Sequence, residues 1–94
     1  VKVEEPAVDL GIVAAMASSF LDKPIDGRTI VLGEVGLAGE VRAVSQMEIR
    51  IKEAARLGFT RCLIPKTNAA QLEKTAKIDI CKIGSLKEML DYLF

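Results

Sequence analysis

The 94-residue chain has no histidine and no tryptophan, and it contains only two cysteines. Without histidine, a Ser-His-Asp triad, a Cys-His pair and a histidine-ligated metal site are excluded. Two cysteines cannot supply the four thiolates of a structural zinc site, and they close at most one disulfide. We therefore expect no metal site, and we interpret Cys62 and Cys81 as small apolar side chains on predicted strands.

A net charge of either sign is also missing, because 13 basic residues balance 13 acidic residues. This balance excludes electrostatic steering of the chain as a whole toward nucleic acid. The longest nearly apolar run, Leu10 to Leu21, is shorter than the roughly 20 residues of a membrane-spanning helix. No signal peptide is recognisable, so we expect a cytoplasmic location and no membrane partner.

The overall balance hides a local asymmetry. Residues 1–41 carry three basic and seven acidic side chains, whereas residues 42–66 carry six basic and two acidic ones. The candidates for phosphate contact are Arg42, Arg50, Lys52, Arg56 and Arg61. The alternative is a solvated helix face with Arg50–Glu53 and Glu48–Lys52 pairs. Because aromatic residues for base stacking are missing, any nucleic-acid binding would be directed at the backbone.

Apolar periodicity and turn residues predict one domain, residues 1–94, with the order β-α-β-β-α-β-α-β-α. Strands are expected at residues 1–3, 29–32, 40–44, 61–65 and 77–83, and helices at residues 7–21, 46–57, 67–76 and 86–93. Ser45 and Ser85 each precede a Glu by three positions, which predicts capping boxes, and Gly58 is expected to end the second helix. The crossovers after Ser45 favour parallel strands.

The loop between the strands at 29–32 and 40–44 is punctuated by Gly33, Gly36 and Gly39. It matches neither the Walker pattern nor the dinucleotide-binding pattern, so we interpret it as a tight connection. A strand that begins at Val1 needs a neighbour to pair with. We therefore expect the chain to be part of a longer protein.

The stretch LGEVGLAGEVR at residues 32–42, followed by a helix and GFTRCLIP at residues 58–65, resembles the carboxy-terminal domain of the bacterial RadA (Sms) DNA repair family. The resemblance covers essentially the whole chain. In that family the domain is related to the proteolytic domain of Lon and follows a zinc ribbon and a RecA-like ATPase core. The resemblance implies an α/β fold, specifically a two-layer α+β fold of the Lon proteolytic or ribosomal protein domain-2 type, truncated at its N-terminus.

Lon peptidases use a Ser/Lys dyad, and the resemblance places both of its positions on this sequence. Aligning Pro6 with the proline of the Lon serine motif puts Ala7 at the serine position. Aligning the glycine-rich segment puts Glu48 at the lysine position. Since neither residue can perform the dyad chemistry, we expect no peptidase activity, and a Lon-type peptidase is kept only as an alternative.

The resemblance further implies a non-catalytic module that supports a hexameric ring and contacts DNA while the ATPase core drives branch migration. The implied partners are further copies of the protein, DNA and the RecA recombinase. The implied parent protein is a DNA-dependent ATPase, with ATP, magnesium and zinc bound upstream of this domain and no cofactor within it. A purely structural oligomerisation domain is the second alternative.

Overall fold

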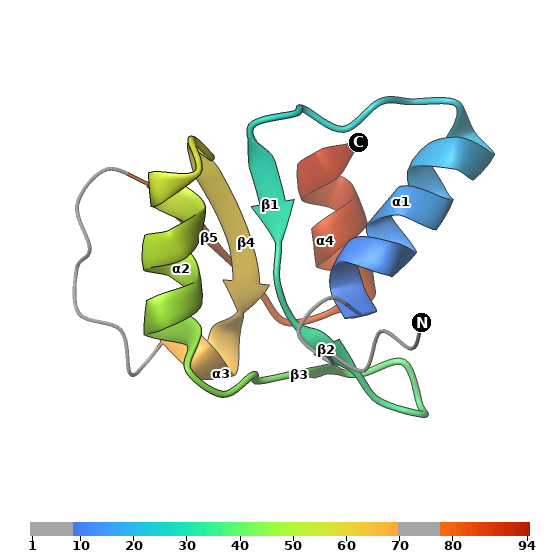
Figure 1. Cartoon of the computed structure of the whole chain (residues 1–94). Coiled ribbons are helices and arrows are strands. Elements are labelled where there is room, and N and C mark those ends of the chain that lie inside the picture. The colour runs from blue at the N-terminus through green and yellow to red at the C-terminus, as the bar shows by residue number, and fades with distance from the viewer. Residues whose placement is uncertain (1–8, 70–77) are drawn as a thin grey trace, which may run out of the picture.

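The computed structural model describes residues 9–69 and 78–94 (Figure 1). Its elements follow the chain as α1 (Asp9–Leu21), β1 (Thr29–Val31), β2 (Glu34–Val35), β3 (Val41–Arg42), α2 (Met47–Arg56), β4 (Arg61–Pro65), α3 (Lys66–Ala69), β5 (Asp79–Ile83) and α4 (Leu86–Leu93). The expected strand at residues 1–3, the position of Ala7 and the greater part of the expected helix at 67–76 lie outside the described residues.

Three parallel strands form the main sheet in the order β1-β4-β5. Arg61 of β4 lies opposite both Thr29 of β1 and Asp79 of β5, so the three strands start at one end of the sheet. This confirms the parallel arrangement predicted for the second half of the chain. The central strand β4 is an almost uninterrupted apolar run, which is typical of a strand buried on both faces.

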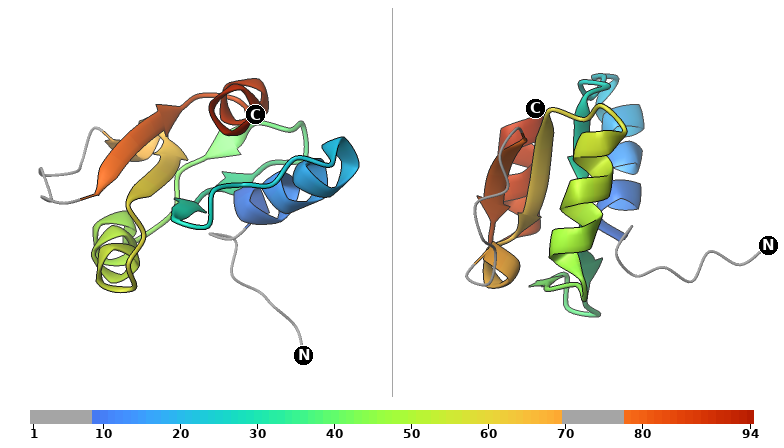
Figure 2. Two further views of the ribbon diagram at one scale, coloured as in Figure 1. Left: turned by 90° about the horizontal axis from the view of Figure 1, so that it is seen from above. Right: turned by 60° about the vertical axis from the view of Figure 1, so that its left-hand side comes forward.

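Successive residues of β4 face two different cores. Cys62 and Ile64 pack with Ile51 of α2, whereas Leu63 packs with α1 and with Met89 of α4. Figure 2 shows α2 on one side of the sheet and α1 and α4 on the other. The expected two-layer arrangement is therefore wrong, although the α/β class is correct. Helices cover both faces of the sheet, because β1 and β4 are apolar on both faces.

A small antiparallel hairpin lies beside the main sheet. Glu34 of β2 pairs with Arg42 of β3, and the tip is closed by a hydrogen bond from Gly36 N to Glu40 O at 2.8 Å. The sequence predicted one strand at 29–32 and another at 40–44, whereas the chain leaves the main sheet near Gly33 and pairs again as β2. A Cβ atom at Gly33 would lie 2.2 Å from the Leu10 side chain, so glycine permits this close passage beneath α1.

The two predicted capping boxes have different outcomes. At α4, Ser85 is the N-cap, and its hydroxyl accepts a hydrogen bond from Glu88 N at 3.1 Å, as predicted. At α2 the prediction is wrong: the N-cap is Gln46, in a left-handed conformation with φ 56° and no side-chain cap. The preceding Val44 main chain is hydrogen-bonded to Asn68, so the chain turns into the helix after Ser45.

Helix α2 ends at Arg56 with Leu57 as its C-cap, and Gly58, with φ +100°, follows as the predicted terminating glycine. Gly58 N donates to Ala55 O and Phe59 N donates to Ala54 O, each at 3.1 Å. These two bonds define a Schellman motif, which requires a residue in the left-handed conformation at the glycine position. The motif directs the chain from α2 straight into β4.

Candidate nucleic-acid interface

Helix α2 carries three of the five basic candidates. Its inner side is fixed by Met47, Ile51 and Ala54, which are buried against the sheet. The helical repeat then directs Lys52 and Arg56 to the solvent, and both side chains are exposed. The sequence thus presents basic side chains on α2 by burying its apolar stripe.

Both exposed cations of α2 already have carboxylate partners. Lys52 Nζ lies 3.3 Å from Glu48 Oε1, which confirms the predicted pair at helical spacing. Arg56 forms a two-point pair with Glu53, with Nε donating to Oε2 at 3.1 Å. The bond from Arg56 lowers the pKa of Glu53 from its ordinary value, and the bond to Glu53 raises the pKa of Arg56. Glu53 therefore bonds to Arg56.

Arg50 lies on a different side of α2 from Lys52. Residues that are two positions apart on an α-helix point about 160° away from each other around the helix axis, because the helix has 3.6 residues per turn. The Arg50 guanidinium folds back toward the start of the helix, where Nε donates to Ser45 O at 3.0 Å. The helix therefore presents its cations in two directions.

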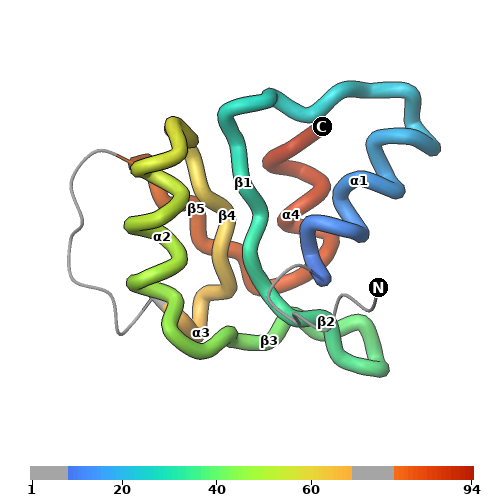
Figure 3. The backbone as a smooth tube through the Cα atoms, viewed as in Figure 1, coloured from blue at the N-terminus to red at the C-terminus, as the bar shows by residue number. Residues whose placement is uncertain are grey.

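Arg42 and Arg61 lie beyond the two ends of α2. Arg42, on β3, contacts Glu40 at 3.1 Å and the cross-strand Glu34 at 4.0 Å. Arg61 is the first residue of β4 and is partly buried, and its Nε has no hydrogen-bond partner among the described residues. Figure 3 shows that β3 leads into one end of α2 and that β4 starts near the other.

The five basic candidates therefore do not form one cluster. They are distributed along a helix of 10 residues, which is about 15 Å long, and beyond both of its ends. The exposed pairs on this surface contribute little to stability, because water screens them. Phosphate groups can compete for these cations, so the arrangement suits contacts spread along a nucleic-acid backbone and not a single bound anion.

Glu48, the residue at the expected lysine position, lies in the first turn of α2. Its side chain pairs with Lys52, and position 48 offers no amine to act as a base. Ala7 lies outside the described residues. Within residues 9–69 and 78–94 there is no group of three or more His, Cys, Asp or Glu side chains that could hold a metal ion.

The two cysteines lie on adjacent strands but face opposite sides of the sheet. Cys62 packs in the core under α2, and Cys81 packs on the side of α1 and α4. Both are free, and burial together with the nearby Cys81 raises the pKa of the Cys62 thiol to about 12. A group with this pKa is a protonated, unreactive filler at neutral pH, as the sequence indicated.

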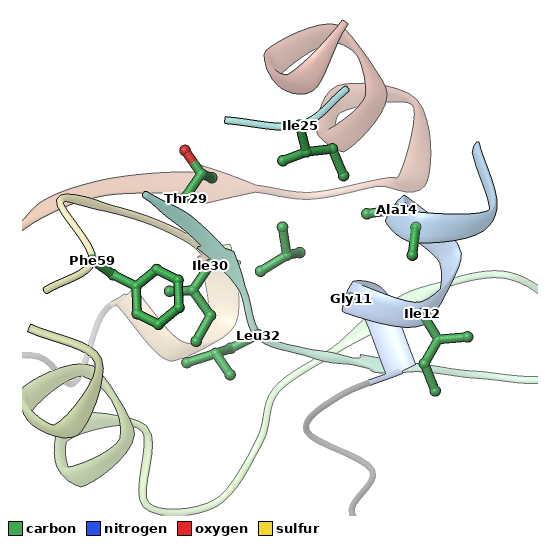
Figure 4. A pocket seen from close by; sticks show the side chains of 10 residues that line it. Gly11, Ile12, Ala14, Ile25, Thr29, Ile30, Leu32 and Phe59 are labelled. Atoms are coloured by element: carbon green, nitrogen blue, oxygen red, sulfur yellow. The ribbon is translucent and has the colours of Figure 1, made fainter. Parts of the chain in front are cut away.

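Sequence reasoning missed an apolar hollow of about 380 Å³ beside β1, which Figure 4 shows from close by. Gly11 and Ile12 of α1 line one side, and Ile30 and Phe59 line the other. Periodicity could not reveal it, because the same apolar residues are expected to face a core. The hollow becomes visible only when the strand order places β1 at an edge.

Comparison with known proteins identifies the class of domain. Residues 1–68 match a family described as subunit ChlI of Mg-chelatase, and the chain therefore belongs to this family. None of the helices in the described part of the chain is both long and apolar enough to cross a membrane.

Individual relatives carry a more specific name. The chain is 40% identical over 94 residues to the DNA repair protein RadA of Streptococcus pneumoniae and 48% identical over 90 residues to that of Bacillus subtilis. It is 55% identical over 65 residues to the RadA protein of Synechocystis. These matches cover 100%, 96% and 69% of the chain, but only 22%, 20% and 13% of the relatives. The resemblance to RadA proteins is confirmed, and the chain spans about a fifth of the length of its first relatives.

Proposed function

We propose that this chain is a non-catalytic, Lon-like module of a RadA-type ATPase of DNA repair and recombination. It supports assembly of a ring, by the family resemblance a hexamer, and contacts DNA during branch migration. The similarity over its full length to proteins named DNA repair protein RadA carries the proposal. ATP, magnesium and zinc would bind elsewhere in the longer cytoplasmic protein, and RecA recombinase is a further proposed partner.

The cations around α2 support the DNA contact. Lys52 and Arg56 are exposed, and Arg42 is 54% exposed on the neighbouring hairpin. A ring that holds DNA needs contacts along the phosphate backbone and no base readout, and the cations around α2 can supply such contacts. Each cation can exchange its carboxylate for a phosphate at little cost, because exposed ion pairs are weak.

The DNA contact is tested by fluorescence anisotropy on the complete gene product, with single- and double-stranded DNA at several salt concentrations. Replacing Arg42, Arg50, Lys52 and Arg56 by Gln should weaken binding and reduce the slope of log affinity against log salt by roughly 0.7–0.9 for each lost phosphate contact. A matched control replaces by Gln the exposed Lys23, which follows α1, and the exposed Lys87 of α4, both on the side of the sheet opposite α2. Unchanged affinity and slope in the first variant would rule out these residues.

Removing the Glu53 carboxylate changes the charge of this surface in the direction opposite to the loss of its basic residues. Glu53→Gln removes the partner of Arg56 and one negative charge from the same surface. If this surface contacts DNA, the variant should bind more tightly and show a steeper salt slope than the parent protein. Weaker or equal binding would argue that Arg56 serves only its ion pair.

An exposed apolar stripe on α1 supports assembly. Ile12, Met16 and Phe20 follow one another at intervals of one helical turn and are 51%, 67% and 89% exposed. A contiguous apolar face in water is typical of a protein interface. Replacing Met16 and Phe20 by Ser should shift the ring toward smaller species in light scattering, whereas Ser19→Ala on the same helix should not.

The alternatives are separated by two further results. A purely structural oligomerisation domain predicts that the protein assembles normally and that its DNA affinity survives deletion of the domain. A Lon-type peptidase predicts hydrolysis of casein by the complete gene product, and we expect none because the positions of the dyad hold Ala7 and Glu48.

A further inference from the structure

The β2–β3 hairpin ends in a closed, uncharged turn. Gly36 N donates to Glu40 O at 2.8 Å, and Gly39 N donates to Gly36 O at 2.9 Å. Gly39, with φ +82°, supplies the left-handed position that such a turn requires. Leu37 lies in this turn and is 107% exposed, the highest fraction among the exposed large apolar residues of the described chain. We call the tip that carries Leu37 the hairpin knob.

The base of the hairpin is fixed to the rest of the domain. Val35 N donates to Asp9 Oδ2 at 3.3 Å, which ties the hairpin to the first residue of α1. Val35 and Val41 also pack against the core between α1 and α4. An exposed leucine is common in itself, but Leu37 is held in water by a closed turn on a fixed base. Such a side chain can bind a partner without the cost of ordering its main chain.

The charged side chains beside the knob are already paired with one another. Arg42 lies 3.1 Å from Glu40 and 4.0 Å from Glu34. Leu37 itself brings no cation that could bind phosphate. The hairpin knob therefore suits the apolar surface of a protein and not a phosphate backbone.

A ring of identical copies needs two different surfaces that fit each other, because each copy contacts its two neighbours with opposite sides. The stripe of Ile12, Met16 and Phe20, which we call the α1 stripe, supplies one surface. The hairpin lies beside the first turn of α1, whereas Phe20 lies in the last turn of this helix, which is about 20 Å long (Figure 1). The α1 stripe and Leu37 are both exposed, so within one copy they do not cover each other.

The exposed large apolar residues outside α1 differ in how well they fit the second surface. Ile49 and Leu57 of α2 share a hollow with Arg50, on the helix for which phosphate contact is proposed. Tyr92 of α4 is only 48% exposed and shares a hollow with two carboxylates. Among these residues, Leu37 combines full exposure with an uncharged turn, so the hairpin knob fits best.

We propose that the hairpin knob of one copy docks on the α1 stripe of the next copy, where Leu37 contacts Met16 and Phe20. This inference rests on the proposed ring and names the two surfaces that meet in it. Each copy gives its knob to one neighbour and receives a knob from the other, which is the kind of contact that closes a ring. The knob anchors an interface that must extend further, since a stable interface takes roughly 800 Å² from each partner.

Photo-cross-linking of the complete gene product tests the contact. A benzophenone amino acid replaces Leu37, and these copies are mixed with copies labelled with ¹⁵N. After irradiation, mass spectrometry should find position 37 of one copy linked to residues 12–20 of another copy. The same group at Thr67, an exposed position on α3, should not become linked to α1.

Light scattering on the same samples separates the possible failures. A ring that forms while position 37 links to its own copy, to DNA or to a segment other than α1 would overturn this inference and leave the proposed ring in place. A ring without any cross-link from position 37 would overturn it equally. A protein that stays monomeric would reject the proposed ring itself, and this inference with it.

A pair of opposite charges gives an independent test. Leu37→Asp and Met16→Lys should each raise the protein concentration needed for half-maximal assembly by about tenfold, with an unchanged melting temperature because both side chains are exposed. The double variant should recover part of this loss, since the two new charges meet across the contact. Leu37→Asp combined with Thr67→Lys is the control and should recover nothing. Equal assembly of the two double variants would contradict the contact.

Discussion

The side-chain amide of Asn68 exchanges two hydrogen bonds with the main chain of Val44. Val44 N donates to Asn68 Oδ1, and Asn68 Nδ2 donates to Val44 O, each at 2.9 Å. Asn68 is only 6% exposed, and it lies in α3, directly after the central strand β4. One side chain therefore supplies both bonds that a neighbouring strand would give to Val44, and it attaches the chain that enters α2 to the end of the sheet.

Replacing Asn68 by Ala should destabilise the protein by about 2–4 kcal/mol, because a buried donor and a buried acceptor of Val44 lose their partners at once. Urea denaturation, followed by circular dichroism, measures the change. Thr67→Ala, an exposed position on the same helix, is the control and should alter stability by less than about 0.5 kcal/mol. A loss at Asn68 no larger than that at Thr67 would mean that the two bonds contribute nothing.

The sequence allowed the elements around this contact to be predicted, but not the contact itself. The apolar run of β4 and the stripe Met47, Ile51 and Ala54 carry strong periodic signals, and both elements are present. Asn68 carries no local signal, because its partner is separated from it by 24 positions in sequence. Local rules therefore identified helices and strands, and long-range polar pairing decided how α2 begins.

The two serines that precede a Glu by three positions offer a matched pair of substitutions. Ser85→Ala should cost about 1 kcal/mol, since the Ser85 hydroxyl accepts the Glu88 amide at the start of α4. Ser45→Ala should cost little, because Gln46 and not Ser45 is the N-cap of α2. Both variants are compared by thermal denaturation. Equal losses at the two sites would contradict the different roles of these serines.

Gln46 should be improved by glycine. Its left-handed main chain, with φ 56° and ψ 35°, is unfavourable for a residue with a Cβ, and its side chain makes no cap bond. Gln46→Gly should therefore raise the free energy of unfolding by up to about 1 kcal/mol, with the greater freedom of glycine in the unfolded chain as the opposing effect. Gln46→Val is the converse variant and should destabilise. A glycine variant less stable than the valine variant would exclude strain at this position.

The buried Cys62 thiol should make stability sensitive to alkali. Burial raises its pKa from 9.0 to about 12, so the folded protein holds this proton more tightly than the unfolded chain does. The contribution of the protonated Cys62 thiol to the free energy of unfolding is fully present below about pH 9. It is lost as the pH rises from about 9 to about 12. Cys62→Ala should therefore show a shallower decline of unfolding free energy between these pH values than the parent protein.

Alkylation with iodoacetamide gives a second measurement of the same difference. At pH 8 the partly exposed Cys81 should react well before Cys62, which has no exposed surface. In concentrated urea both thiols should react at similar rates, which controls for the intrinsic reactivity of each. Native modification of Cys62 at the rate of Cys81 would show that the core around it opens freely.

The candidate interface was predictable only in part. Composition identified the basic segment, and helical spacing found the Glu48–Lys52 pair, because both depend on local sequence. The sequence could not show that the Arg50 side chain turns back to bond to Ser45 O. It also could not show that the hairpin brings Glu34 and Glu40 to Arg42. Those contacts depend on turn geometry and on pairing between strands. The local positive charge is consequently smaller than the residue count of 42–66 suggested.

The parallel order of the main sheet has a consequence for the time course of folding. Thr29 meets Arg61, and Arg61 meets Asp79, so each pairing waits until an intervening crossover has been synthesised and collapsed. Parallel pairings across such distances close large loops before they gain contacts, which slows folding. Among the described residues, the β2–β3 hairpin and the individual helices are the elements with local pairing that can form early on the ribosome. Both other strands of the main sheet pair with β4, so the native order of this sheet is established when β4 pairs with β1 and β5.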